Sequence, residues 1–292
     1  MVRKEYSIEN IRRLFLDELS PGYNPDEIKE FLYILCRDFS GWSKGRFLME
    51  LKTVLPWPEA SLLLEALTKL KSGMPVQYIT GKADFNGLSF HVNPDVLIPR
   101  QETAELAGII LEELSGKELM NYRILDIGTG SGCIAVFLKK KLPGARVFAL
   151  DSSAPALETA RKNAEELGTE IHFLQQDILS KNINIPVPEM DMIVSNPPYV
   201  MMKEKKGIRI NVKEFEPSSA LFVPDDDPLL YYRAIADHSP VILSEGGILF
   251  LEINESFGAE VAGTLLSRGF GRVEVKKDFF GKDRFIRAEF KI

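Results

Sequence analysis

From Tyr122 to the end of the chain, short apolar runs alternate with stretches of helical periodicity, and this pattern constrains the fold more than any other feature. A helix that follows a strand carries the chain back, so that the next strand can run in the same direction. The pattern therefore predicts an α/β fold with a doubly wound parallel sheet. The expected strands are Tyr122–Ile127, Arg146–Asp151, Glu170–Gln175, Asp191–Ser195, Gly247–Ile253, Arg272–Lys276 and Arg284–Phe290, and the expected helices are Cys133–Leu142, Ala154–Leu167, Leu229–Asp237 and Phe257–Leu266.

The first part of the chain has a helical pattern without strands. One helix is expected to begin at Asn24 as N-cap with Pro25 in its first turn, and others near Ile8–Leu19, Lys44–Leu55 and Pro58–Leu70. Glycines and a proline then interrupt two β-like runs, Gln77–Thr80 and Leu88–Val92, which predict a hairpin. We expect a helical bundle over 1–73, a linker with a β-hairpin over 74–95 and a larger domain over 96–292. The bundle is either a packed scaffold or a module that docks a partner.

Composition narrows the class of protein. A chain of 292 residues with 45% hydrophobic content can bury a sizeable core. Its formal net charge of −6 gives no broad attraction to nucleic acid, and no apolar stretch is long enough to span a bilayer. Its 2 cysteines and 3 histidines are too scattered for a disulfide framework or a metal site. We therefore expect a cytoplasmic protein without a metal.

A glycine-rich loop follows the first expected strand of the larger domain. The loop runs Gly128-Thr129-Gly130-Ser131-Gly132 and leads directly into an expected helix. Glycines allow the backbone to approach a ligand closely, and the helix N-terminus faces the anionic end of that ligand. A nucleotide-like ligand is therefore predicted at this loop.

Carboxylates near this loop refine the prediction. Asp151 ends the next strand, about twenty residues after the loop, where a carboxylate can accept hydrogen bonds from both ribose hydroxyls. Asp177 follows the third strand, where an adenine could lie, and Asp126 is either a strand-end cap or a contact for the amino group of the cofactor. Because the loop has the spacing GxGxG and not GxGxxG, the pattern favours S-adenosylmethionine over a nicotinamide cofactor.

The tetrapeptide Asn196-Pro197-Pro198-Tyr199 ends another buried strand, where open α/β sheets bind ligands. The side-chain oxygen of Asn196 can accept a hydrogen bond, and residues before proline are held extended, so the carbonyls of Asn196 and Pro197 have fixed directions. Tyr199 can stack on a flat group. This combination predicts a site that grips an NH2 group and aims its nitrogen at a sulfonium methyl, with Asn196, Pro197 and Tyr199 as the catalytic residues.

At this point the chain resembles the HemK family, also called PrmC, the release factor glutamine N5-methyltransferases, over essentially its whole length. Besides DIGTGSG and NPPY, the resemblance rests on Pro75–Gly81, Phe85–Gly87, Val96–Thr103, Glu216–Pro217 with Ala220–Leu221, and Gly281–Arg284. It implies an N-terminal helical bundle, a linking β-hairpin and a seven-stranded, Rossmann-like class I S-adenosylmethionine-dependent methyltransferase domain. The implied substrate is the glutamine of the GGQ tripeptide in class I peptide chain release factors, and the cofactor product is S-adenosylhomocysteine.

Carried onto this sequence, the resemblance assigns residues to both ligands. It implies that the glutamine lies at Asn196–Tyr199 and that Arg100 and Glu102 are pocket-wall residues, for which a surface ion pair and a first-turn helix carboxylate are equally good interpretations. Gln101, Ile178 and the segment Leu251–Asn254 depart from the family pattern. The implied cofactor contacts are Gly128 to Gly132, Asp151, Asp177, Ile178 and Asn196.

Three other interpretations compete with a release factor methyltransferase. A ribosomal-protein glutamine would need the same chemistry, and an N6-adenine or N2-guanine nucleic-acid methyltransferase would use the NPPY acceptors on a flipped base. The acidic balance argues against direct binding of nucleic acid. A non-enzymatic cofactor-binding module is disfavoured because both motifs are intact. The segment Met201–Asp227, with charges and several prolines, is expected to be a mobile, irregular loop over the site.

Overall fold

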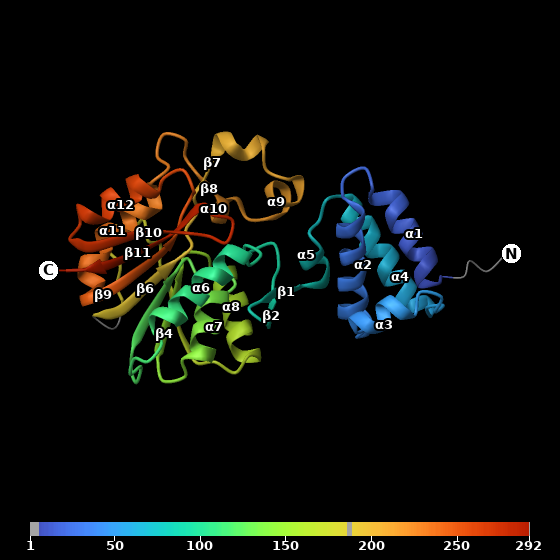
Figure 1. Ribbon diagram of the computed structural model, residues 1–292, viewed down its shortest axis with the longest axis horizontal. Helices are drawn as coiled ribbons and strands as arrows, with labels where there is room; N and C mark the ends of the chain where they lie inside the picture. Colours follow the sequence, from blue (N-terminus) through green and yellow to red (C-terminus); the bar gives the residue numbers. More distant parts are fainter. Residues whose placement is uncertain (1–5, 186–188, 292) are drawn as a thin grey trace. The chain divides into compact units, whose positions relative to one another are not determined.

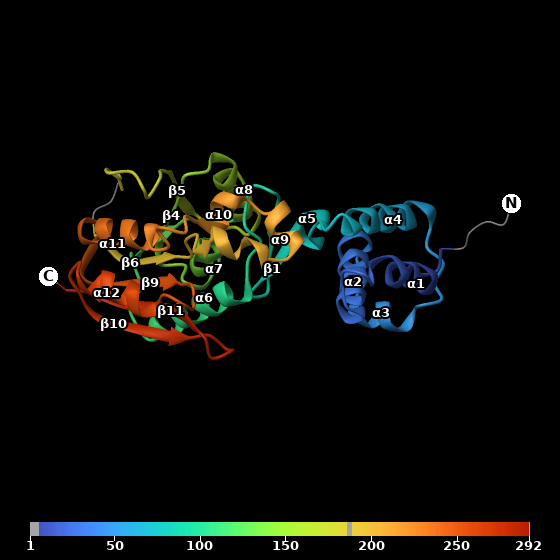
Figure 2. The ribbon, with the colours of Figure 1, turned by 90° about the horizontal axis from the view of Figure 1, so that it is seen from above.

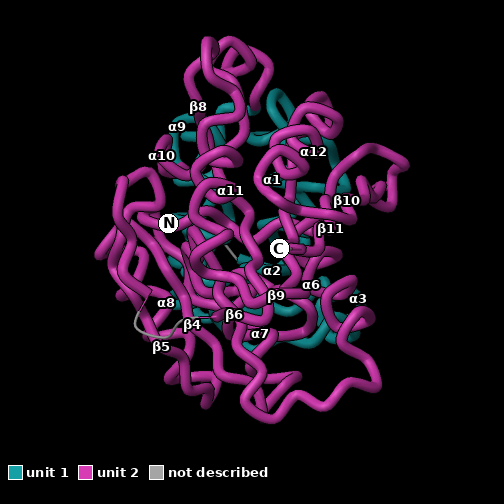
Figure 3. The backbone as a smooth tube through the Cα atoms, turned by 90° about the vertical axis from the view of Figure 1, so that its left-hand side faces the viewer, with its two compact units in different colours: residues 1–82, 209–215 teal, residues 83–208, 216–292 magenta. Residues whose placement is uncertain are grey.

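The computed structural model describes residues 6–185 and 189–291, which divide into two compact units. One unit holds the chain up to Lys82 together with Arg209–Phe215, and the other holds Ala83–Ile208 and the chain from Glu216 onward (Figure 3). Each unit has its own buried apolar core.

The smaller unit is a helical bundle, whose part up to Lys82 is drawn from blue to teal in Figure 1 and whose helix α9 is drawn in orange. α2 begins as predicted, since the Asn24 side chain accepts a hydrogen bond from the Glu27 N–H and Pro25 lies in the first turn. The core includes Phe15, Leu32 and Leu63, which are buried. The unit comprises α1 (Ile8–Leu19), α2 (Pro25–Ser40), α3 (Lys44–Met49), α4 (Trp57–Lys71), α5 (Val76–Thr80) and α9 (Ile210–Phe215). The expected N-terminal helical region is confirmed.

The helix predicted over Lys44–Leu55 is too long, because α3 ends at Met49. The backbone after it binds α1 instead of continuing a helix. The carbonyls of Leu51 and Thr53 accept hydrogen bonds from the first N–H groups of α1, those of Glu9 at 2.8 Å and Ile8 at 3.1 Å. The first N–H groups of a helix have no partner within that helix, and these contacts satisfy two of them in α1. The Leu51 and Thr53 carbonyls therefore point to α1 and do not continue the hydrogen bonding of α3.

The β-like run Gln77–Thr80 is also wrong, because it forms the short helix α5. Val76 is buried in the bundle core, and Gly81, with φ 70°, ends the helix in the left-handed conformation. The hairpin lies after it, with strands β1 (Lys82–Phe85) and β2 (Leu88–His91). β-branched and aromatic content made this helix look like a strand, whereas burial within the bundle decided its conformation.

The larger unit is built on a seven-stranded sheet with the order β10-β11-β9-β6-β3-β4-β5. Its parallel strands are β3 (Arg123–Ile127), β4 (Arg146–Asp151), β5 (Ile171–Gln175), β6 (Met190–Ser195) and β9 (Leu243–Glu252). Strand β11 (Asp283–Phe290) runs antiparallel to both β9 and β10 (Phe270–Lys277). The chain leaves β5 at one edge and re-enters the sheet at β6, beside β3. This reversal between β3 and β6 is where open α/β sheets bind ligands.

Successive residues of the central strands point to opposite faces, and helices cover both faces (Figures 1 and 2). Ile124 packs in one core with side chains of α6 (Gln101–Glu113), α7 (Cys133–Lys141) and α8 (Ala154–Glu166), whereas Leu125 packs in a second core with side chains of α11 (Leu230–Ile242) and α12 (Gly258–Leu266). The predicted α/β class is confirmed, and α6 is a helix that the periodicity analysis missed.

The segment Met201–Asp227 is not the irregular loop that was predicted. It contains η1 (Met202–Lys206), α9, α10 (Ser218–Leu221) and β8 (Phe222–Val223), which pairs with β7 (Val200–Met201). Pro217 is the N-cap of α10 and Pro224 follows β8, so these prolines border short elements instead of preventing them. Among the residues that the structure describes, no helix combines the length and apolar character needed to cross a bilayer.

Candidate active site

A cavity lies at the carboxyl ends of β3, β4 and β6, at the reversal of strand order. Of the predicted site residues, those that line it are Arg100, Gly128, Thr129, Gly130, Ser131, Asp151, Asp177, Ile178, Asn196, Pro197 and Pro198. Glu102, Asp126, Gly132 and Tyr199 are not among the lining residues. One cavity thus contains both the glycine loop and the start of the NPPY motif.

The glycine loop adopts backbone conformations that favour glycine. Gly128, Gly130 and Gly132 have φ values of 71°, 54° and 79°, in the left-handed region. A Cβ at Gly128 or Gly130 would meet no atom within 4 Å, so glycine is needed there for backbone conformation, and the space beside both residues stays open. A Cβ at Gly132 would lie 3.0 Å from the Ala160 Cβ, so this glycine also lets α8 pack against the start of α7.

Gly132→Ala should therefore destabilise the fold by about 1–3 kcal/mol, from left-handed strain and the close contact with Ala160. Urea unfolding of both proteins would measure this loss. Gly263→Ala in α12 is the matched control, since its Cβ would meet nothing within 4 Å and alanine favours a helix. An equal loss in both variants would contradict the packing argument.

The Asp151 carboxylate is held in place by backbone N–H groups. Its Oδ2 accepts from Gly130 N–H and its Oδ1 from Ser153 N–H, both at 2.9 Å. Burial raises the pKa of Asp151, and these hydrogen bonds counteract that effect. Each carboxylate oxygen can accept a further bond. The side chain is thus preoriented at the cavity wall, where a diol could bind it.

Asp126 lies beneath the glycine loop and is buried. Its Oδ2 accepts from the Thr129 hydroxyl at 2.6 Å, while its buried Oδ1 has no hydrogen-bond partner among the residues that the structure describes. Burial raises the pKa of Asp126 to about 7. Of the two roles considered for it, the capping contact is present. An unsatisfied buried acceptor beside a ligand cavity also fits a cationic amino group nearby.

Beyond Asp151, the cavity wall continues through Asp177 and Ile178. The Asp177 Oδ1 accepts from the Leu179 N–H at 2.9 Å, which turns the loop after β5, and Ile178 is buried. A carboxylate next to a buried apolar side chain gives this part of the cavity one polar and one apolar wall. Such a surface suits a flat heteroaromatic ring.

At the other end of the cavity, the NPPY residues join a hydrogen-bond chain. The Asn196 Nδ2 donates to the Thr103 Oγ1 at 2.9 Å, and the Thr103 hydroxyl donates to the Glu252 Oε2 at 2.7 Å. The Tyr199 hydroxyl donates to the Glu252 Oε1 at 3.1 Å. Glu252 is 1% exposed and Thr103 3%. We call these four residues, Asn196, Thr103, Glu252 and Tyr199, the Asn196–Tyr199 hydrogen-bond chain.

The sequence alone indicates no role for Thr103 or Glu252. Both occurred only as letters in longer segments, Thr103 in one that carried the family resemblance and Glu252 in one that departed from it. A signal did exist for Glu252, because it ends the apolar strand β9 as Asp151 ends β4. A carboxylate at the carboxyl end of a buried parallel strand is a candidate site residue in such sheets.

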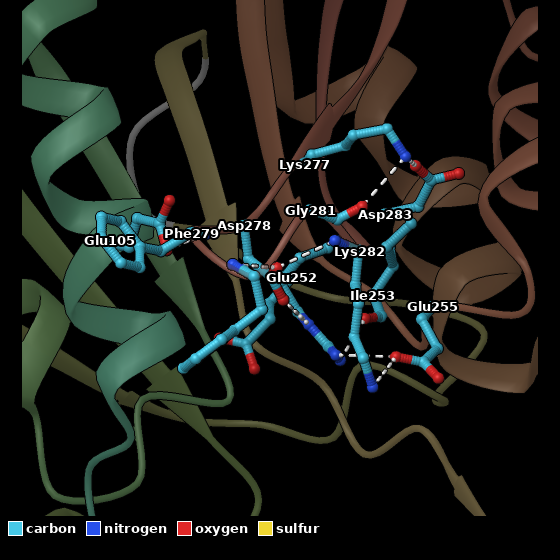
Figure 4. A network of polar contacts seen from close by, with 12 residues as sticks. Glu105, Glu252, Ile253, Glu255, Lys277, Asp278, Phe279, Gly281, Lys282 and Asp283 are labelled. Atoms are coloured by element: carbon cyan, nitrogen blue, oxygen red, sulfur yellow. Dashed lines mark hydrogen bonds and ion pairs between the residues drawn. The ribbon is translucent and has the colours of Figure 1, made fainter.

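The charge on Glu252 is held in an apolar setting. Burial is the largest influence and raises its pKa to about 7, against the hydrogen bonds from Thr103 and Tyr199 and the positive charge of Arg284. Arg284 is itself held by the Asp278 Oδ2 at 3.2 Å and by the Ile253 carbonyl oxygen, within the contacts around the β10–β11 turn shown in Figure 4. Burial and the nearby Glu252 also keep the pKa of Tyr199 well above its usual value.

Arg100 lies at the cavity wall and forms the expected ion pair, but its acidic partner is buried. Its Nη2 contacts the Glu216 Oε1 at 2.6 Å, and the Glu216 side chain is only 1% exposed. The second Glu216 oxygen accepts from the Ile98 N–H at 3.1 Å. Glu102 lies in the first turn of α6, so the helix-terminus interpretation fits its position.

Known proteins resemble this chain over almost its whole length. A methyltransferase small domain matches residues 103–215 and a PrmC N-terminal domain matches residues 14–81. The release factor glutamine methyltransferase of Flavobacterium psychrophilum is 43% identical over 286 residues, 97% of this chain and 99% of that protein. The enzyme of the same name from Bacteroides thetaiotaomicron is 43% identical over 266 residues, 91% of this chain and 94% of that protein.

Solved structures share the fold. The Thermus thermophilus 16S rRNA methyltransferase RsmC, in complex with AdoMet and guanosine, matches with a TM-score of 0.52 and 19% identity over 72% of this chain and 50% of that chain. The hMettl16 catalytic domain matches with a TM-score of 0.53 and 19% identity over 82% of this chain and 84% of that chain. These likenesses confirm a methyltransferase fold. Together with the relatives of high identity, they establish that this chain is a methyltransferase and belongs to the release factor glutamine methyltransferase family.

Proposed function

We propose that this enzyme transfers a methyl group from S-adenosylmethionine to the side-chain amide nitrogen, N5, of the glutamine in the GGQ motif of class I release factors. The observation that carries the proposal is a single cavity with a glycine loop and Asp151 on one wall and Asn196-Pro197-Pro198 on another. Relatives that match almost the full chain carry the name release factor glutamine methyltransferase, which supports this substrate over the alternatives.

The residues at the glycine loop fit the cofactor. Asp151 would accept hydrogen bonds from the two ribose hydroxyls, and the backbone of Gly128 to Gly132 would approach the methionine part closely. Asp177 and Ile178 would contact the adenine, and the unpartnered Oδ1 of Asp126 would favour the nearby ammonium. When bound, the cofactor supplies an electrophilic methyl group on a sulfonium and leaves as S-adenosylhomocysteine.

Asp151→Ala should weaken S-adenosylmethionine binding by roughly 10–100-fold, since a hydrogen bond to a charged group contributes about 1.5–3 kcal/mol. Isothermal titration calorimetry would measure the change. Asp151→Asn is the matched variant and should lose less, because it keeps one acceptor oxygen. Unchanged affinity in Asp151→Ala would show that the ribose lies elsewhere.

The contribution of the protein to the reaction is to orient the glutamine amide nitrogen, which is a weak nucleophile. An amide nitrogen has a delocalised lone pair, so it reacts only when it is held in line with the methyl carbon. The Asn196 Oδ1 and the Pro197 carbonyl, both on lining residues of the cavity, would accept from the two N–H bonds of the glutamine amide. With the amide nitrogen so oriented, a bound cofactor would supply the methyl group, and the methylated nitrogen, being cationic and acidic, would lose its proton to water. No separate catalytic base is assigned.

A protein substrate also needs contacts outside the catalytic cavity. We propose that the helical bundle over 1–73 provides them, with 74–95 as linker and 96–292 as the transferase domain. Direct nucleic-acid binding is not part of the proposal, given the formal net charge of −6. Because release factors act in translation, the proposal places the enzyme in the cytoplasm.

Mass spectrometry of an unmethylated class I release factor, after incubation with this protein and S-adenosylmethionine, tests the proposal. One added methyl that maps to the GGQ glutamine is the expected result. An unmodified release factor, with cofactor binding verified by calorimetry, would overturn it and favour a ribosomal-protein glutamine or a nucleobase. Incubating the same enzyme with ribosomal proteins and with RNA would then distinguish those two.

A further inference from the structure

We propose that Glu252 is a positioning residue for methyl transfer: through Thr103, it fixes which end of the Asn196 side-chain amide is available to the substrate. This inference rests on the proposed function, since it concerns how the glutamine amide is gripped. Glu252 itself does not touch the reacting atoms. It acts through the Asn196–Tyr199 hydrogen-bond chain. The Glu252 Oε2 accepts from the Thr103 hydroxyl at 2.7 Å, and the Thr103 Oγ1 accepts from the Asn196 Nδ2 at 2.9 Å.

The direction of this chain follows from the charge at its end. The ionised carboxylate of Glu252 has no proton to donate, so the single hydroxyl proton of Thr103 points to the Glu252 Oε2. The Thr103 Oγ1 then offers only lone pairs to Asn196, and the Asn196 end that can meet them is the Nδ2 donor. The Asn196 Oδ1 is left for another partner.

The orientation matters because the two ends of an asparagine amide have almost the same shape and opposite hydrogen-bonding character. A glutamine amide presents two N–H donors. With Oδ1 toward it, Asn196 accepts one of them. If the amide were turned over, N–H groups would face N–H groups, and the substrate would lose this contact and its aim at the methyl group.

The stability of the folded protein does not explain why a carboxylate, and not a glutamine amide, lies at position 252. Glu252 is 1% exposed and its oxygens accept from two neutral hydroxyls, those of Thr103 and Tyr199. Other charged groups act on it from a distance, with Arg284 favouring its ionised form and Glu102 opposing it. Burying a charge costs free energy that a glutamine of the same shape would spare. In its ionised form, Glu252 differs from a glutamine in that it accepts on both oxygens and donates on neither.

Glu252→Gln tests this property with little change in shape. The new NH2 group can donate to the Thr103 Oγ1, which frees the Thr103 hydroxyl to donate to the Asn196 Oδ1 and turn the amide over. We expect kcat for release factor methylation to fall about a hundred-fold, as for loss of one preoriented polar contact. The S-adenosylmethionine Kd from calorimetry should change less than about three-fold, because the cofactor contacts are elsewhere in the cavity.

Thr103 variants test the chain without touching the carboxylate. Thr103→Val breaks it and should lower kcat by a similar factor, whereas Thr103→Ser keeps the hydroxyl and should retain most of the turnover. Thr159→Val is the matched control, since Thr159 is also buried and its Oγ1 accepts from an asparagine, Asn93, at 3.1 Å, but it does not line the cavity. It should keep wild-type kinetics.

The double variant Thr103→Val with Glu252→Gln separates a shared chain from two independent defects. If both residues act on Asn196 through one chain, the double variant should be no slower than the slower single variant. Two results would overturn the inference. One is a loss of kcat in the double variant equal to the product of the two single-variant losses, and the other is wild-type kcat in folded Glu252→Gln. Absence of release factor methylation by the wild-type enzyme would instead refute the proposed function. If Glu252→Gln does not fold, equal turnover of Thr103→Val and Thr103→Ser would overturn the inference.

Discussion

Asn196→Ala should lower kcat by roughly a hundred- to a thousand-fold, while the Kd for S-adenosylmethionine stays nearly unchanged. The variant loses an acceptor that is preoriented by Thr103 at 2.9 Å, and one such contact commonly contributes about 2.7–4 kcal/mol to transition-state stabilisation. Steady-state kinetics with the release factor and calorimetry with the cofactor would measure the two effects separately.

Asn93→Ala provides a matched control for this substitution. Asn93 also donates its Nδ2 to a buried threonine, Thr159, but neither residue lines the cavity. It should therefore leave kcat within about two-fold of wild type. Near-normal turnover of Asn196→Ala would refute the mechanism. A loss of equal size in both variants would mean that the effect comes from general disturbance of the fold and not from the site.

Asp126→Asn should change how stability depends on pH. Burial raises the pKa of Asp126 to about 7 in the folded protein, far above its value of about 3.9 in an unfolded chain. Between these values the folded state binds the extra proton, so its contribution to stability is full at low pH and is lost as pH rises toward 7. From pH 5 to pH 8 the wild type should lose about 3 kcal/mol through this group, which the neutral asparagine cannot lose.

Urea unfolding of both proteins at pH 5 and pH 8, without cofactor, would measure this difference. Glu252 has the same raised pKa, but it is present in both proteins, so its contribution cancels in the comparison. The asparagine has a pH-independent cost of its own, because its NH2 group would lie at the unpartnered Oδ1 position. The test is therefore how the difference in free energy of unfolding between the two proteins changes from pH 5 to pH 8. A difference that is equal at both pH values would show that Asp126 is ionised throughout.

Sequence patterns predicted an element well where local chemistry sufficed. The strand Arg146–Asp151 has the same bounds in the prediction and in the structure, because a continuous apolar run suits a strand buried on both faces. The helix after Asn24 begins where its cap and its proline predicted. Two of the errors, at α5 and at the end of α3, arose where burial in the bundle and hydrogen bonds to α1 determined the conformation. Neither influence can be found within a short window of sequence.

By itself, the sequence determined the α/β class, the glycine loop, the strand-end carboxylate Asp151 and the NPPY motif, because each depends on neighbouring residues or on a regular period. Only the tertiary structure decided which residues bind the Asn196 side chain. Thr103 lies 93 positions before Asn196 and 149 before Glu252, and the sheet brings the three together. A hydrogen bond depends on distance and angle in space, so a chain of such bonds between remote residues leaves no local pattern in the sequence.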